Sequence, residues 1–398
     1  MIIGIPREIL AGERRVALDP PSVKKRVEEG FDVLVEAGAG EQACFVDAEY
    51  EAAGARLAPE AAQVFGEAEI VLKVQPPQPL VTPQAAMAGS NGGHEVDLLS
   101  EGASLIALLK PLDQPEVAER LAKRRVSAFA MELMPRITRA QSMDALSSQS
   151  TIAGYQAVLM AANALPRIFP MMVTAAGTLQ PSKLLVIGAG VAGLQALGTA
   201  KRLGAITSAY DTRPVVREQV ESVGARFVEL ELSTESAEDA GGYATAQTED
   251  FYQRQRELLG EYVAASDVVI TTALVPGQRA PLLIEESAIE RMRGGSVVVD
   301  LAAEKGGNCA CTKPDEEVVA HGVTLIGWTN LPSFAPSHAS QMYAKNVTTF
   351  LDHLLEEGRL KLDLEDEITA GTLVTHEGRI LNERIQELLG SDASGSRS

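Results

Sequence analysis

Cysteine, aromatic residues and positive charge are all scarce in this chain of 398 residues. Three cysteines are too few for a disulfide scaffold, and they indicate a reducing compartment. The 35 Lys and Arg against 54 Asp and Glu give a net charge of −19, which argues against direct binding to nucleic acids or anionic lipids. Uninterrupted apolar runs of about 18 residues are also missing, so we expect a cytoplasmic protein without direct lipid insertion.

Histidine is rare as well, and its five copies lie at no spacing typical of a metal site. Cys309 and Cys311 form a C-x-C pair, but a structural zinc site normally needs further ligands at a recognisable spacing. We therefore expect no resident metal.

The chain does contain short β-branched runs that alternate with amphipathic segments, which predicts an α/β fold with parallel sheets. Strands are expected at 2–5, 33–36, 70–74, 105–109 and 126–131. A second series is expected at 184–187, 206–210, 226–230, 267–271, 296–301 and 323–326, which is the strand count of a full Rossmann sheet. Long helices at 148–165 and 341–355 would link the two series.

This pattern predicts two Rossmann-like doubly wound domains. The first is discontinuous, over 1–145 and 340–398, and the second is a dinucleotide-binding domain over 146–339. The second series also opens with the glycine-rich segment LLVIGAGVAGLQA.

Gly188, Gly190 and Gly193 in this segment form G-x-G-x-x-G between an expected strand and an expected helix. The first glycine permits a tight turn, the second lets the backbone approach a pyrophosphate, and the third lets helix and strand pack closely. Val191 and Ala192 would offer the helix N-terminus to the phosphates. A glycine-rich turn without a ligand is the alternative.

Asp211 follows Gly188 by 23 residues, at the end of the next expected strand. A carboxylate there accepts hydrogen bonds from the ribose hydroxyls and repels a 2′-phosphate, so it favours NAD(H) over NADP(H). Thr212 and Arg213 lie in the same turn, and an arginine so placed can accommodate the phosphate instead. The segment that ends at Leu274 should line the same edge of the sheet.

Several sequence segments, spread over nearly the whole chain, resemble those of one family. They are PRITRAQSMDALSSQS at 135–150, MMVTAAGT at 171–178, GGYA at 241–244 and DLAAEKGGNC at 300–309. They are similar to the NAD(H)-binding alpha subunit of proton-translocating NAD(P) transhydrogenase. The resemblance implies a homodimer held on the inner face of a membrane by membrane-spanning and NADP(H)-binding subunits. It also implies direct hydride transfer between NADH and NADP+ on the partner domain, coupled to proton translocation.

The resemblance also assigns roles to a loop beside the nicotinamide of NADH. Arg136 and Asp144 would fix the ring and each other, Gln141 would reach toward the ribose of NADP(H), and Ser147 would be a further nicotinamide contact. From the residues alone, Arg136 and Asp144 could instead be a salt bridge that caps the following helix.

An acidic loop at 233–250 contains Gly242 and Tyr243. A loop of this length inside a compact domain is usually functional or disordered. The corresponding loop of the family closes over the bound nucleotide, so we expect a lid that Tyr243 helps to close. A surface insert is the alternative.

Alanine dehydrogenase, which shares the two-domain architecture, is the main competing function. Arg15 and Lys73 match residues that hold the substrate carboxylate in those enzymes. Their acid–base histidine, however, is replaced here by Lys110. Hydride transfer between two nicotinamides requires no general acid or base, so the missing histidine favours transhydrogenation. A catalytically silent NAD sensor is a third alternative, although it has no need of a loop prepared for a second nucleotide.

Overall fold

The computed structural model describes residues 1–80, 93–230, 249–275 and 277–395. It divides into two compact units. The first unit is Met1–Gln149 with Ala335–Ser398, and the second is Ser150–Phe334. The chain passes from the first to the second through the long helix α7 (Ala145–Ala164).

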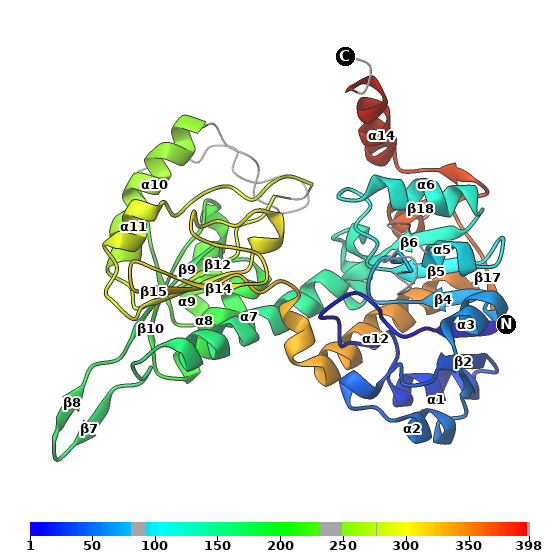
Figure 1. The fold of residues 1–398 in the computed structure, drawn as a ribbon, viewed down its shortest axis with the longest axis horizontal. Coiled ribbons are helices and arrows are strands. Elements are labelled where there is room, and N and C mark those ends of the chain that lie inside the picture. Colours follow the sequence, from blue (N-terminus) through cyan, green and yellow to red (C-terminus); the bar gives the residue numbers. More distant parts are fainter. Residues whose placement is uncertain (81–92, 231–248, 276, 396–398) are drawn as a thin grey trace, which may run out of the picture. The chain divides into compact units, whose positions relative to one another are not determined.

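The described part of the first unit contains an eight-stranded sheet in the order β19-β18-β6-β5-β4-β1-β2-β3 (Figure 1). Its strands are β1 (Ile2–Ile5), β2 (Asp32–Glu36), β3 (Arg56–Ala58), β4 (Ile70–Leu72), β5 (Ser104–Ala107), β6 (Ser127–Ala130), β18 (Leu373–His376) and β19 (Arg379–Ile380). From β6 to β3 every pairing is parallel, and this part has the Rossmann order. β18 extends the sheet antiparallel to β6, and β19 in turn pairs antiparallel with β18.

Helices cover both faces of this sheet, because successive side chains of a buried strand point to opposite sides. Ile106 and Phe129 pack with Phe350 of the long helix α12, whereas Leu105 and Ala128 pack on the other side with Leu121 of α6. The helices in the described part of this unit are α1 (Pro20–Glu28), α2 (Asp47–Ala52), α3 (Ala61–Glu67), α5 (Glu95–Leu98), α6 (Pro115–Lys123), α12 (Pro336–Leu354), α13 (Glu367–Thr372) and α14 (Glu383–Gly395).

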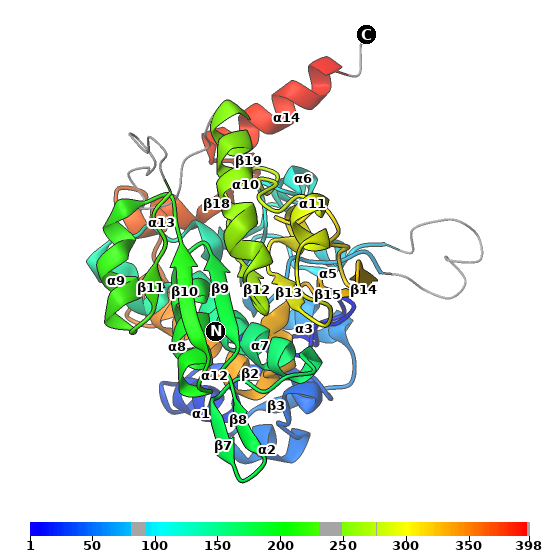
Figure 2. The same ribbon diagram turned by 90° about the vertical axis from the view of Figure 1, so that its left-hand side faces the viewer.

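The described part of the second unit contains a seven-stranded sheet in the order β11-β10-β9-β12-β13-β15-β14 (Figure 2). The strands are β9 (Lys183–Ile187), β10 (Ile206–Tyr210), β11 (Arg226–Phe227), β12 (Val268–Thr271), β13 (Val297–Asp300), β14 (Glu317–Ala320) and β15 (Val323–Ile326). Six of them are parallel and again follow the Rossmann order, with β14 added as an antiparallel edge. The doubly wound fold expected for both series is confirmed.

The second sheet is also buried on both faces. Val186 and Ile270 pack against α7 and α8 (Val191–Arg202), while Leu185 and Val269 pack against α10 (Glu249–Ala264) and α11 (Glu286–Glu290). A further short helix, α9 (Arg217–Ser222), follows β10. The 3-10 helices of the two units lie at Glu41–Ala43, Met131–Leu133, Thr138–Met143, Pro214–Val216, Ala303–Lys305 and Leu331–Phe334.

A two-stranded hairpin in the second unit stands apart from its sheet. It consists of β7 (Met172–Thr174) and β8 (Gly177–Leu179), and it projects from the body of the unit (Figures 1 and 2). Val173 is 73% exposed and Leu179 is 54% exposed. A smaller hairpin, β16 (Leu355–Glu356) with β17 (Arg359–Leu360), follows α12 in the first unit.

Candidate functional site

The glycine-rich segment forms the turn between β9 and α8, as the sequence predicts. Gly188 has a φ of +97°, which favours glycine, and a Cβ on Gly193 would lie 2.1 Å from the carbonyl oxygen of Gly188. A Cβ on Gly190, in contrast, would meet no described atom within 4 Å. Gly188 and Gly193 are therefore needed by the fold itself, whereas Gly190 borders open space.

This open space lies at the N-terminus of α8. Gly190 is the N-cap residue that precedes the helix, so no described side chain caps the first N–H groups of α8. Val191 opens the helix with its side chain 39% exposed, and Ala192 follows half-buried. The first N–H groups of a helix have no intrahelical partner, and together with the helix dipole they favour an anion such as a phosphate.

Asp211 lies directly after β10 and is tied to the glycine turn. Its Oδ2 accepts a hydrogen bond from the N–H of Ala189 at 2.8 Å. The carboxylate also accepts hydrogen bonds from the backbone N–H, Nε and Nη2 of Arg213, each at 2.9 Å. Thr212, between the two, is half-buried. The guanidinium that the sequence left as a candidate for a 2′-phosphate is therefore already neutralised by Asp211.

The end of β12 completes this edge of the second sheet. The hydroxyl of Thr272 donates to the carbonyl oxygen of Gly188 at 2.7 Å, which joins the two central strand ends. Leu274 follows with its side chain 41% exposed. The structure thus brings together the predicted glycine turn, Asp211 and the strand end that leads to Leu274, all within the second unit.

The loop expected beside the nicotinamide lies in the first unit. Arg136 and Gln141 are exposed, and Gln141 belongs to the 3-10 helix Thr138–Met143. Asp144 caps α7: its carboxylate accepts hydrogen bonds from the N–H of Ser147 at 2.9 Å and from its hydroxyl at 2.6 Å. Asp144 therefore has a capping role at the start of α7, through Ser147.

Side chains beneath this loop hold it in place. The side-chain amide of Asn346, from α12, donates to the carbonyl oxygen of Ser142 at 2.9 Å. Ala140 and Met143 are buried in the core of the first unit. The exposed Gln141 thus stands on an anchored turn. The other loop residues with an expected role, Gly242 and Tyr243, lie outside the described residues.

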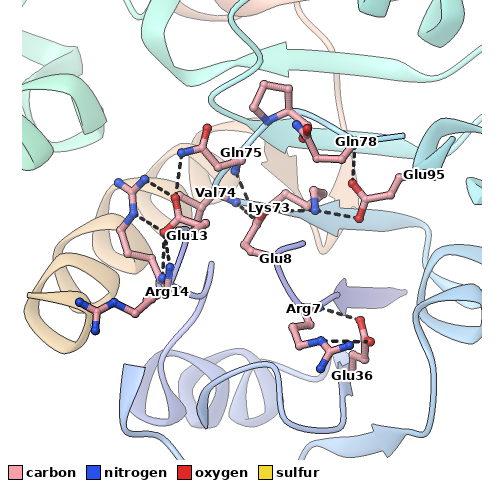
Figure 3. Close-up of polar contacts among 12 residues, drawn as sticks. Arg7, Glu8, Glu13, Arg14, Glu36, Lys73, Val74, Gln75, Gln78 and Glu95 are labelled. Carbon is pink, nitrogen blue, oxygen red and sulfur yellow. Dashed lines mark hydrogen bonds and ion pairs between the residues drawn. The ribbon is translucent and has the colours of Figure 1, made fainter. Parts of the chain in front are cut away.

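A second group of polar side chains lies inside the first unit, at the ends of β1 and β4 (Figure 3). Lys73 is fully buried, with its Nζ 3.2 Å from Glu8 and 3.1 Å from Glu95. Arg15 is 3% exposed and pairs with Glu13 at 2.6 Å. We call Glu8, Glu13, Arg15, Lys73 and Glu95 the buried charge cluster.

Burial and pairing shift the protonation of this cluster. Burial raises the pKa of Glu8 to about 7, although Lys73 acts in the opposite direction. Burial alone would lower the pKa of Lys73, but Glu8 and Glu95 together raise it above its usual value. The cluster carries three carboxylates against two cations, and Arg15 also donates to Gln149 at 2.8 Å. Both cations that the sequence matched to alanine dehydrogenases are therefore paired with carboxylates of the chain itself.

Several residues that shape these sites were not predicted from the sequence. Glu8, Glu13 and Glu95 carry no recognisable motif. Gly154 of α7 was also missed: a Cβ there would lie 2.1 Å from the carbonyl oxygen of Ala192, so α7 packs closely on the start of α8. A lone glycine inside a helix is too common to signal such a contact.

The described residues offer neither a metal-binding cluster nor a membrane-spanning helix. Among them, no three His, Cys, Asp or Glu side chains are grouped so that they could hold a metal ion. None of the helices in the described ranges is long and apolar enough to cross a membrane.

Comparisons with known proteins agree with this architecture. Residues 4–153 match the alanine dehydrogenase/PNT N-terminal domain, and residues 157–383 match the C-terminal domain of the same family. The chain is 48% identical, over 96% of its length and 98% of the relative, to a protein of Rhodospirillum rubrum that is the first section of an NAD(P) transhydrogenase subunit alpha. An alanine dehydrogenase of Halomonas elongata is more distant, at 30% identity over 98% of this chain and 97% of the relative.

Among solved structures, a transhydrogenase from Sinorhizobium meliloti is similar with a TM-score of 0.83 and 43% identity, over 96% of this chain and 100% of the other. Both domain matches and the near full-length identity lead to one conclusion. This chain belongs to the alanine dehydrogenase/PNT family, among the NAD(P) transhydrogenase alpha subunits.

Proposed function

We propose that this chain is the NAD(H)-binding component of a transhydrogenase. It passes hydride directly between NADH and NADP+ held by a partner subunit, and the reaction is coupled to proton translocation by membrane-spanning subunits. The observation that carries the proposal is the open space at Gly190, at the N-terminus of α8 and beside Asp211. That combination suits the pyrophosphate and ribose of a dinucleotide.

The nucleotide selected is NAD(H). Asp211 presents a negative charge where a 2′-phosphate would have to lie, and its four hydrogen-bond donors keep the carboxylate in place. Arg213 is engaged by the same carboxylate, so it offers no free charge to the phosphate of NADP(H). NADP(H) is therefore assigned to the partner subunit. Tyr243 and Gly242 belong to the proposed lid, and Leu274 to the pocket wall.

The exposed loop of the first unit supplies the chemistry. Arg136 fixes the nicotinamide of NADH together with Asp144 and Ser147, while Gln141 reaches the second nucleotide. This assignment is supported by the exposure of Arg136 and Gln141 on a turn that buried neighbours hold in place. A hydride acceptor on another subunit needs such an accessible and rigid surface.

The chain acts as a homodimer on the inner face of the membrane. The projecting β7–β8 hairpin supports assembly with a second copy, because an isolated two-stranded hairpin is marginally stable in water. Its apolar side chains Val173 and Leu179 would gain burial in an interface.

The decisive experiment mixes the purified chain with an NADP(H)-binding transhydrogenase subunit and follows hydride transfer from NADH by stopped flow. We expect transfer with the partner and none without it. In parallel, the chain alone is supplied with alanine and NAD+. Alanine-dependent formation of NADH would instead support the alanine dehydrogenase activity that Arg15 and Lys73 suggested. Limited proteolysis at 233–250 tests the lid, and cleavage that saturating NADH leaves unchanged would contradict it.

A further inference from the structure

Asn308, to which no sequence motif assigns a role, holds the end of β12 in the second unit. It is fully buried in the loop after β13. Its side-chain oxygen accepts a hydrogen bond from the N–H of Ala273 at 3.0 Å, and its amide nitrogen donates to the carbonyl oxygen of the same residue at 2.9 Å. The amide also donates to the carbonyl oxygen of Pro281 at 2.8 Å. One side chain therefore satisfies both backbone groups of Ala273.

Asp300 in turn fixes the loop that carries Asn308. It is the last residue of β13 and is 1% exposed. One carboxylate oxygen accepts hydrogen bonds from the hydroxyl of Thr271 at 2.8 Å and the N–H of Ala302 at 3.0 Å. The other accepts from the N–H groups of Asn308 at 2.8 Å and Cys309 at 3.1 Å. A buried carboxylate with four donors is a rigid anchor.

The position of Ala273 matters because its neighbour Thr272 contacts the glycine turn. The Thr272 hydroxyl donates to the carbonyl oxygen of Gly188, and a Cβ on Gly188 would lie 3.1 Å from the nitrogen of Ala273. The glycine turn has its own support from the other side, since the N–H of Gly188 donates to the carbonyl oxygen of Tyr210 at 2.8 Å. Loss of Asn308 would therefore displace the end of β12 more than the glycine turn.

We propose that Asn308 is a positioning residue for one half of the dinucleotide, and that it acts through Ala273. The inference rests on the proposed binding of NAD(H) to the second unit. A Rossmann sheet binds a dinucleotide across the point where its strand order reverses, here between β9 and β12, with one mononucleotide on each half. Asp211 stands after β10 on the adenosine half. Asn308 and Ala273 therefore serve the nicotinamide half.

The test compares NADH with AMP, which has only the adenosine half. Asn308→Asp keeps the shape and the acceptor, but it removes both donated hydrogen bonds and turns a carboxylate toward two carbonyl oxygens. We expect the NADH dissociation constant to rise about tenfold or more, because the buried backbone groups at the site lose their partners. The AMP constant should stay within about threefold of the wild-type value. Calorimetry or fluorescence for NADH and ligand-observed NMR for AMP would measure both.

Two controls separate positioning from general weakening of the fold. Val263→Ala truncates a fully buried side chain of the same unit, so it should lower the melting temperature and leave both constants unchanged. Asn308→Ser removes the reach of the amide without adding charge, and it should repeat the selective loss of NADH. Wild-type NADH affinity in the Asn308 variants, or an equal loss of NADH and AMP, would overturn the inference. A wild-type protein that binds neither ligand would instead refute the proposed function.

Amide hydrogen exchange on the wild-type protein provides a further test, which does not depend on whether the variants fold. The N–H of Ala273 should exchange slowly before any nucleotide is added, because the Asn308 side chain already binds it. Rapid exchange of this amide in the free protein would show that the contact does not hold the strand end, and would also overturn the inference.

Discussion

The two sheets share a strand order, yet their central strand ends are built from opposite kinds of residue. In the first unit the chain continues from β1 and β4 into Glu8 and Lys73, which form a buried ion pair. In the second unit the corresponding strands, β9 and β12, continue into Gly188 and Thr272, beside the open space at Gly190. A Rossmann strand order therefore provides the place for a dinucleotide, while the residues at that place decide whether there is room for one.

The largest expected effect is on the free energy of unfolding, and it comes from the buried charge cluster at the strand ends of the first sheet. Lys73→Met leaves Glu8 and Glu95 buried without their cation, so we expect about 3–5 kcal/mol of destabilisation. Denaturant unfolding measures this, and NADH affinity below the unfolding transition should stay near that of wild type. Lys24→Met is the matched control, since Lys24 is largely exposed and should matter little. Wild-type stability of Lys73→Met would refute the structural role of the cluster.

The strand ends of the second sheet, beside the open space at Gly190, should respond in the opposite way, with a change in NADH affinity and little change in stability. Gly190→Ala adds a methyl group where the structure has no neighbour, so the melting temperature should change little. The same methyl group occupies space needed by the pyrophosphate, and NADH affinity should fall about 100-fold. Gly198→Ala, within α8 and likewise without a described neighbour near its Cβ position, is the control and should leave the affinity unchanged. Equal affinities of the two variants would contradict the phosphate site.

A change at Gln141 should affect the rate of hydride transfer but not the binding of NADH. Gln141→Asn withdraws the amide by about an ångström, so we expect hydride transfer to slow about 10–100-fold while the NADH dissociation constant stays within threefold. Arg136→Ala should impair both, because it would remove the proposed contact with bound NADH. Stopped flow with the partner subunit, together with NADH titration, distinguishes the two effects. As a control, Gln63→Asn shortens a glutamine outside the loop. It should change neither the rate of hydride transfer nor the NADH dissociation constant. A wild-type rate for Gln141→Asn would remove Gln141 from the mechanism.

Asp211→Asn should shift selectivity by a smaller factor. The amide still accepts from Ala189, but it no longer repels a 2′-phosphate and it releases Arg213 from its ion pair. We expect the preference for NADH over NADPH to fall about tenfold. Fluorescence titration with both nucleotides measures the ratio, and an unchanged ratio would show that Asp211 does not select the nucleotide.

The smallest effect concerns pH. Glu8 has a folded-state pKa raised from 4.5 to about 7, so the folded protein binds a proton that the unfolded chain has released over this range. The contribution of Glu8 to stability is therefore full below about pH 4.5 and declines as the pH rises toward 7. Glu8→Gln should flatten this decline in urea unfolding between pH 5 and 8. Glu28→Gln, at an exposed carboxylate, should keep the wild-type slope.

The regular parts of the fold could be predicted because their signals are local. Long apolar runs such as those of β9 and β13 indicate buried parallel strands from a few consecutive residues. β3 and β14 were missed because a three-residue strand and a strand with half-exposed side chains have no such run. β7 and β8 were missed because neither side of the hairpin is buried.

The candidate sites divide in the same way. The glycine turn and Asp211 carry a motif with fixed spacing, so the sequence located them. The buried charge cluster joins Arg15 and Glu13 with Lys73 and Glu95, which lie far apart in the chain, and pairing over such distances leaves no local signal. Asn308 was overlooked for a related reason, since its partners Ala273 and Pro281 contribute only backbone atoms.

The exposed hairpin carries a built-in chemical label. Met171 is 61% exposed and Met172 is 44% exposed. Solvent-accessible methionine is oxidised to its sulfoxide by peroxide, which turns a flexible apolar side chain into a polar one. Any protein surface that covers the hairpin would shield both thioethers from the oxidant. The extent of sulfoxide formation at these two positions, read by mass spectrometry, therefore reports how much of the hairpin is covered at a given concentration. Oxidative damage there would in turn make the hairpin a poorer surface for the proposed assembly with a second copy.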